Sequence, residues 1–128
     1  YQSLIAGINQ ARPGKHVADI SNAVATVITI GRYGIVKEYV GHGIGTTMHE
    51  EPQIPNFGSG LPGPELTEGM CICIEPILTF NDPAILALDG PWNIITEAGD
   101  IAAHWEHTVY IGPNGPEVLT KRQDETLP

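Results

Sequence analysis

Residues 41–52, Gly-His-Gly-Ile-Gly-Thr-Thr-Met-His-Glu-Glu-Pro, carry the strongest structural signal in the chain. The glycines on either side of His42 allow the backbone to approach a neighbouring segment closely, which a histidine on the wall of a tight pocket requires. A glycine-rich turn that holds an incidental histidine is the alternative. A nucleotide-binding loop is not supported, because Pro52 and Pro55 follow where such a loop would lead into a helix. The segment therefore predicts a strand end or loop that presents His42.

Two glutamates elsewhere in the chain lie among mainly apolar residues, Glu75 in Ile-Glu-Pro and Glu106 in Trp-Glu-His-Thr. An ionised carboxylate is costly to bury unless it is paired or coordinates a cation. Either glutamate alone is most simply an exposed strand residue, but the two together favour a shared explanation. Carboxylate oxygen and imidazole nitrogen are ligands for hard and borderline divalent ions. We therefore predict a metal centre formed by His42, Glu75 and Glu106, although three ligands are too few to hold two ions.

The composition of the chain narrows the classes of molecule that it is expected to bind. The chain has 128 residues, of which 41% are hydrophobic, so it is long enough for one domain with a packed core. Its 15 acidic and 6 basic residues give a net charge of -9, which disfavours nucleic acid or an anionic membrane as partner. No run of about 18 apolar residues is long enough to span a bilayer. Cations and small peptides are the favoured ligands.

The two cysteines, Cys71 and Cys73, lie in the strand-like run Met-Cys-Ile-Cys-Ile. Residues two apart in a strand point to the same face, where they are poorly placed to form a disulfide with each other. We therefore expect free thiols, which are compatible with a reducing compartment. A Cys-x-Cys zinc half-site is the alternative, but the sequence has no second cysteine pair to complete it.

Hydrophobic periodicity predicts two helices followed by strands, which is an α+β order. The first helix covers 1–11, and the second begins near Val17 and ends with Gly31 as its C′ residue. Residues 52–64 are rich in proline and glycine and are expected to form an irregular surface loop. The expected strands are 35–40, 70–78, 92–95, 102–111 and 117–120.

These motifs, in this order, resemble type I methionine aminopeptidases. The matching stretches are 41–52, 66–76, Trp92, 102–108 and 115–120. The resemblance implies a pita-bread fold, of which this chain would be the C-terminal half, two helices followed by a curved antiparallel sheet. Residues 1–128 would be the C-terminal part of a single metallopeptidase catalytic domain, with the N-terminal half absent.

The resemblance also implies roles for individual residues. The implied metal ligands are His42, Glu75 and Glu106, with Glu106 bridging two ions. His49 would contact the scissile peptide and help stabilise the transition state, and a solvated loop histidine is the alternative for it. Glu75 would also carry the proton from the attacking water to the departing amine. Trp92 would help to form the wall of the pocket for the methionine side chain.

The family's metal site also uses two aspartates and a further histidine from its N-terminal half. No aspartate of this chain matches them, neither Asp19, Asp82, Asp89 nor Asp100. The complete enzyme is expected to bind two divalent ions (Co, Mn, Fe or Zn), while this chain alone is expected to be inactive. The complete enzyme would be a cytoplasmic monomer that removes the initiator methionine from nascent chains, with the ribosome as a partner.

Two other hypotheses remain open. The unmatched aspartates favour a non-catalytic remnant of the same fold that serves as a binding module. A relative of the Xaa-Pro dipeptidases is also compatible with the Gly-His-Gly motif, although these enzymes do not usually continue into His-Glu-Glu-Pro.

Overall fold

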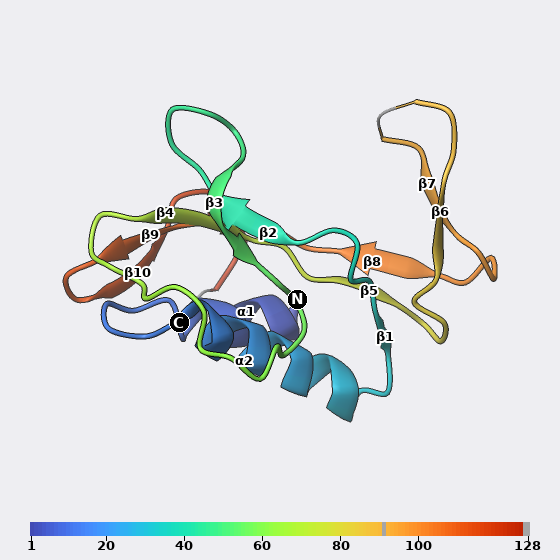
Figure 1. The fold of residues 1–128 in the computed structure, drawn as a ribbon, viewed down its shortest axis with the longest axis horizontal. Helices are drawn as coiled ribbons and strands as arrows, with labels where there is room; N and C mark the ends of the chain where they lie inside the picture. The colour runs from blue at the N-terminus through green and yellow to red at the C-terminus, as the bar shows by residue number, and fades with distance from the viewer. Residues whose placement is uncertain (91, 127–128) are drawn as a thin grey trace.

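The computed structural model describes residues 1–90 and 92–126, whose arrangement is shown in Figure 1. Two helices come first, α1 (Gln2–Ile8) and α2 (Val17–Ile30). The strands within the described residues are β1 (Gly34–Ile35), β2 (Gly41–Gly43), β3 (Glu50–Ile54), β4 (Cys71–Ile74), β5 (Ile77–Thr79), β6 (Ile85–Ala87), β7 (Ile94–Thr96), β8 (Ala102–His104), β9 (His107–Gly112) and β10 (Gly115–Val118). Every strand pair is antiparallel, so the expected α+β class is confirmed.

Helix α2 forms because apolar side chains recur every three or four residues along one face. The buried members of this stripe are Val17, Ile20, Val24 and Ile28. At its start, the Asp19 carboxylate accepts a hydrogen bond of 2.8 Å from the His16 backbone N–H. At its end, the prediction for Gly31 was wrong by one residue: Gly31 is the C-cap with φ −71, and Arg32 takes the left-handed conformation with φ 59. The helix therefore ends one residue later than the predicted C′ position of Gly31 implied.

The five-stranded sheet has the order β10-β9-β4-β2-β3, and the two helices pack against one of its faces (Figure 1). Because side chains alternate across a strand, alternate residues of the central strands point at the helices. The core that results contains Leu4, Ile8, Ile20, Val24, Ile72, Ile74, Val109 and Ile111. The intervening residues Cys73 and Thr108 point to the opposite face, which the helices leave open.

Two of the expected strands are each divided in the structure. The run 70–78 breaks after Ile74 into β4 and β5, and the run 102–111 breaks after His104 into β8 and β9. Strands β4 and β9 belong to the five-stranded sheet, whereas β5 and β8 belong to a three-stranded sheet of order β1-β5-β8. Residues 75–76 and 105–106 therefore lie where the chain passes from one sheet to the other.

Three further expectations were wrong in part. Of the expected strand 35–40, only Ile35 belongs to a strand, β1, because the chain then leaves the three-stranded sheet for β2. The expected irregular loop begins as β3, in which Pro52 is tolerated because β3 is an edge strand. Strand β6 was not expected, and it forms a separate hairpin with β7 that projects away from the helices (Figure 1). The expected strands 92–95 and 117–120 exist as β7 and β10, each shifted by two residues or fewer at its start.

Candidate metal centre

The register of the large sheet places three site-facing side chains in one row. His42 of β2 is opposite Cys73 of β4, and Cys73 is opposite Thr108 of β9. Directly opposed residues of antiparallel strands have Cβ atoms only about 4.5–5.5 Å apart. Glycine on either side of His42 makes the approach possible, because a Cβ on Gly41 would collide with the Cys73 carbonyl oxygen. A strand with larger residues there cannot bring His42 against β4.

Glu75 and Glu106 follow this row at the points where the strands break. Ile74, the last residue of β4, pairs with His107, the first residue of β9; Glu75 directly follows Ile74 and Glu106 directly precedes His107. The Glu75 backbone carbonyl accepts a hydrogen bond of 3.1 Å from the Asn56 side-chain amide, which anchors the bend. Each glutamate lies just outside the strand, and both carboxylates lie on the side of His42: Glu75 contacts its ring, and Glu106 belongs to the same group of ligand atoms.

The Glu75 carboxylate lies between two imidazoles. Its Oε1 is 3.4 Å from His42 Nε2, and its Oε2 is 3.4 Å from His104 Nε2. The Glu75 side chain is only 14% exposed, so a negative charge there needs such partners. The hydrogen bond to Glu75 raises the pKa of His104 above its ordinary value, burial opposes this, and the charges of Glu75 and Glu106 add to it.

Potential ligand atoms gather in two overlapping groups that share Glu106. One group comprises His42, Cys73 and Glu106, and the other comprises Glu75, His104 and Glu106; within each, the ligand atoms all lie within 4.8 Å of one another. Imidazole nitrogen, carboxylate oxygen and thiol sulfur are all ligands for divalent transition metals. Each group offers three donors, one fewer than a tetrahedral ion takes. The predicted trio of His42, Glu75 and Glu106 is thus brought together, and its chemistry fits a divalent ion.

The two predicted substrate residues lie in different places. His49 follows the short loop after β2, and its ring centroid is 4.3 Å from that of His42, at an angle of 55°. It therefore borders the metal centre. Trp92 lies in the β6–β7 connection and is 78% exposed. The structure thus brings His49 beside His42.

Cys73 and His104 were not predicted as site residues. Cys73 is two positions before Glu75, and His104 is two positions before Glu106, so strand alternation alone indicates a shared face for each pair. This spacing plays no part in the sequence-based prediction for Cys73, which is that of a free thiol. Cys73 is buried, and burial is the main cause that raises the pKa of its thiol, with the charges of Glu106 and Glu75 acting in the same direction.

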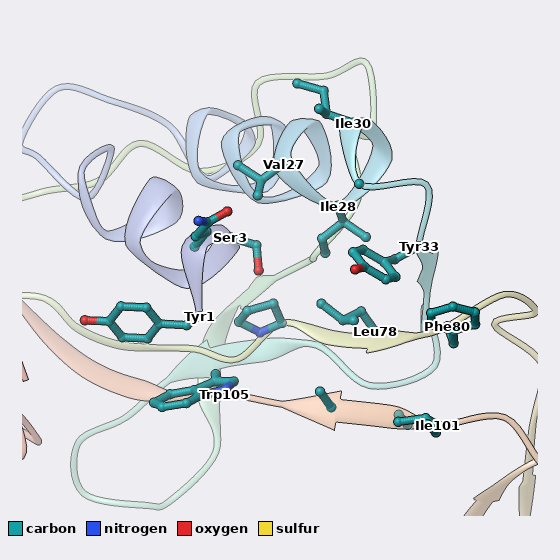
Figure 2. Close-up of a pocket in the computed structure, with 15 residues that line it drawn as sticks. Tyr1, Ser3, Val27, Ile28, Ile30, Tyr33, Leu78, Phe80, Ile101 and Trp105 are labelled. Atoms are coloured by element: carbon teal, nitrogen blue, oxygen red, sulfur yellow. The ribbon is translucent and has the colours of Figure 1, made fainter.

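Two cavities differ in chemistry. An open pocket of about 450 Å³ lined by His104, Trp105, Glu106 and Arg122 adjoins the metal centre. A larger cavity of about 640 Å³ lies between the helices and the three-stranded sheet, where Figure 2 shows Val27 and Ile28 above Leu78 and Trp105. None of its lining residues in the described part of the chain is a histidine, cysteine or acid. We assign the chemistry to the side of the smaller pocket, because two of its lining residues, His104 and Glu106, belong to the groups of ligand atoms.

No helix in the described ranges has the length and apolarity to cross a membrane. Comparison with solved structures gives a methionine aminopeptidase from Rickettsia prowazekii, with a TM-score of 0.89 and 33% identity over 94% of this chain and 49% of that one. A prolidase from Pyrococcus furiosus is more distant, with a TM-score of 0.69 and 26% identity over 94% of this chain and 30% of that one. Both likenesses confirm the expected pita-bread fold.

Sequence comparison leads to the same group of proteins. A methionine aminopeptidase from Clostridium perfringens is 40% identical over 119 residues, which are 93% of this chain and 48% of that protein. The chain thus spans about half the length of the curated relatives it matches. The resemblance to methionine aminopeptidases inferred from the motifs is confirmed. Residues 1–113 match the model of metallopeptidase family M24, and the chain therefore belongs to this family.

Proposed function

We propose that the protein is a type I methionine aminopeptidase, and that residues 1–128 form the C-terminal part of its catalytic domain. The observation that carries this proposal is the convergence of the His42, Glu75 and Glu106 donors on the open face of the sheet. The methionine aminopeptidases among the relatives support the choice of substrate. The complete protein would remove the initiator methionine from nascent chains with a small second residue.

Membership of a metallopeptidase family implies a divalent metal, and the ligand set proposed for it is His42, Glu75 and Glu106. Such an ion supplies Lewis-acid activation of water and of the scissile carbonyl. Glu106 belongs to both groups of ligand atoms, which supports its role as the bridging ligand of a two-ion site. The additional ligands that two ions need would come from other parts of the complete protein. The ion would be Co, Mn, Fe or Zn, which share a preference for oxygen and nitrogen ligands.

Protein groups around the centre would handle the proton and the substrate. Glu75 would accept a proton from the attacking water and pass it to the departing amine, which needs a carboxylate held close to both. His104, 3.4 Å from Glu75, would keep that carboxylate oriented. His49, beside His42, would donate a hydrogen bond to the developing oxyanion. Trp92 would help to form the wall of the pocket for the methionine side chain.

Substitution of the shared ligand tests the proposal. Glu106→Gln, in the protein expressed from its complete coding sequence, should lower metal content per chain and abolish methionine release from Met-Ala-Ser. Glu117→Gln is the matched control, because Glu117 is an exposed acid of β10. Metal content by atomic spectroscopy and product by chromatography give separate readouts. Wild-type metal content and activity in Glu106→Gln would refute the ligand assignment.

The two alternatives make different predictions. The likeness to a prolidase supports an Xaa-Pro dipeptidase, which would release dipeptides that end in proline instead of methionine from Met-Ala-Ser. A non-catalytic binding module would cleave neither substrate in the presence of any of the four metals. Parallel assays of both substrates with the metal-loaded protein therefore separate the three hypotheses.

The cellular setting follows from the proposed substrate. An enzyme that acts on nascent amino termini would work in the cytoplasm, near the ribosome, and as a monomer. Co-sedimentation with ribosomes in a lysate tests the association with the ribosome, and sedimentation velocity of the purified protein tests whether it is a monomer.

A further inference from the structure

We propose that Cys73 is an additional ligand of the centre, so that His42, Cys73 and Glu106 form a site for a thiophilic divalent ion such as Zn²⁺ or Cd²⁺. The inference rests on the ligand roles proposed above for His42 and Glu106. It adds the Cys73 thiolate to a ligand set that otherwise consists of oxygen and nitrogen atoms. Cys73 would make the centre sensitive to soft cations.

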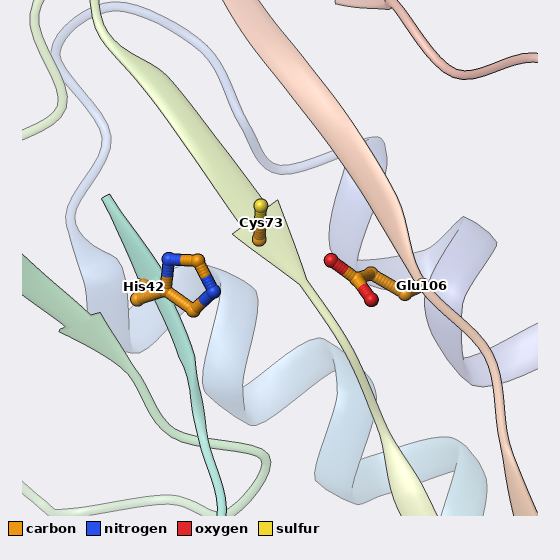
Figure 3. Close-up of side chains that lie close together, drawn as sticks. All are labelled: His42, Cys73 and Glu106. Carbon is orange, nitrogen blue, oxygen red and sulfur yellow. The ribbon is translucent and has the colours of Figure 1, made fainter. Parts of the chain in front are cut away.

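The placement of the thiol supports this role. Cys73 is directly opposite His42 across the β2–β4 pair, and Figure 3 shows the His42 ring and the Glu106 carboxylate on either side of it. The three ligand atoms lie within 4.8 Å of one another. An ion bound tetrahedrally at about 2.0–2.3 Å needs its ligand atoms about 3.3–3.8 Å apart, so the separations must shorten by up to about 1.5 Å, which side-chain rotations would provide.

The environment of the thiol is also suitable. The Cys73 residue is only 2% exposed, and its Sγ forms a hydrogen bond of 3.5 Å with Thr108 Oγ1, which holds the thiol weakly because sulfur is a weak donor and acceptor. A metal ion that replaces this contact gains a full coordination bond. As the sulfur–metal bond forms, the S–H bond breaks and the proton leaves to solvent, so that one proton is released per ion bound at neutral pH.

Thiolate ligation changes which ions the centre prefers. Sulfur favours soft and borderline cations, whereas carboxylate and imidazole alone also serve Mn²⁺. A cation held by Cys73 as well as by His42 and Glu106 would be retained more tightly than one held by the two conventional ligands. Cd²⁺ would therefore compete with the ion that supports peptide hydrolysis.

The second cysteine provides a matched control. Cys71 lies two residues earlier on β4 and on the same face, but it belongs to neither group of ligand atoms among the described residues. The protein from its complete coding sequence, freed of metal with a chelator, is titrated with Cd²⁺ alone. The ultraviolet sulfur-to-cadmium charge-transfer band reports thiolate ligation directly, and calorimetry gives the affinity.

We expect wild-type protein and Cys71→Ser to develop the band with one Cd²⁺ per chain. Cys73→Ser should lack the band and bind Cd²⁺ about 10–100-fold more weakly, at least the loss caused by removing an outer-shell partner. Its Mn²⁺ affinity should be unchanged, which also shows that the variant is folded. Cd²⁺ binding to wild type without the band, or a band that survives Cys73→Ser, would overturn this inference and leave the proposed function intact. Failure of wild type to bind any divalent ion would overturn both.

Discussion

At the scale of single residues, Gly41 controls how closely β2 approaches β4. An added methyl group there meets the backbone carbonyl of Cys73, which no side-chain rotation can move aside. We expect Gly41→Ala to lower the free energy of unfolding by about 1–3 kcal/mol, as overpacking in a rigid site does. Because His42 would shift with the strand, metal affinity should fall as well. Urea denaturation and metal titration measure the two effects.

The control for this substitution is Gly58→Ala. A Cβ at Gly58 meets only the side-chain end of Asn22, which can rotate away. Its effect on stability should be smaller than that of Gly41→Ala, and its metal affinity should remain that of wild type. Equal losses in the two variants would mean that close packing at Gly41 is unimportant.

The candidate site shows how far single residues can be interpreted before a structure is known. His42, Glu75 and Glu106 were predicted because their polar chemistry contrasts with apolar or glycine-rich surroundings. Cys73 has no such contrast, since a cysteine in an apolar strand is most often a core residue. His104 enters the site through its contact with Glu75, which depends on the pairing of β5 with β8. Pairing between distant strands was not predictable from local sequence.

At the scale of elements, the breaks in the long strands position the carboxylates. Pro76 follows Glu75 directly and cannot donate to a strand ladder, so β4 ends where the ligand is needed. The break before β9 has no comparable local signal, because Trp105 and Glu106 are both compatible with a strand. The apolar runs were therefore predicted as strands, but their division between two sheets became evident only from the structure.

The C-terminal segment, residues 120–125, contacts β9 through the side chain of His107, on the face that points away from the ligand atoms. His107 is fully buried, with Nδ1 2.9 Å from Thr120 Oγ1 and Nε2 3.1 Å from Glu125 Oε2. Glu125 also accepts a hydrogen bond of 2.6 Å from Arg122, whose guanidinium lies 4.5 Å from the Trp105 ring centre. Since Glu106 lies between Trp105 and His107, this segment fixes the backbone on both sides of a proposed ligand.

The Glu125 contact predicts a pH dependence of stability. Hydrogen bonds from the Arg122 backbone and side chain, with the charge of His107, hold the pKa of Glu125 below its ordinary value of 4.5. A carboxyl group with a lowered folded-state pKa stabilises the protein above its unfolded pKa, and this contribution is lost as pH falls through the folded value. Between pH 7 and acid conditions below 4.5, wild type should therefore lose more stability than Glu125→Gln.

Urea midpoints measured across this pH range test the prediction. Glu117→Gln, which removes an exposed acid of β10, should follow the wild-type curve. Parallel curves for wild type and Glu125→Gln would show that the ionised carboxylate does not stabilise the C-terminal segment.

At the scale of the whole molecule, the large sheet separates two functions. One face packs on α1 and α2 and forms the hydrophobic core, while the other presents the ligand atoms. The chain spans about half the length of its curated relatives, and three donors per group leave coordination positions open. Core and centre are therefore coupled through the strands that they share, β4 above all.

This coupling predicts that metal stabilises the fold. A ligand that binds only the native state adds about 2.7 kcal/mol to stability at 100 times its dissociation constant. Chelation of the protein from its complete coding sequence should lower the thermal midpoint, and added Mn²⁺ or Co²⁺ should restore it. Glu106→Gln should lose this response because it removes the ligand common to both groups, whereas Glu117→Gln should retain it. An equal response in Glu106→Gln would locate the stabilising ion elsewhere in the protein. Differential scanning calorimetry with and without chelator provides the measurement.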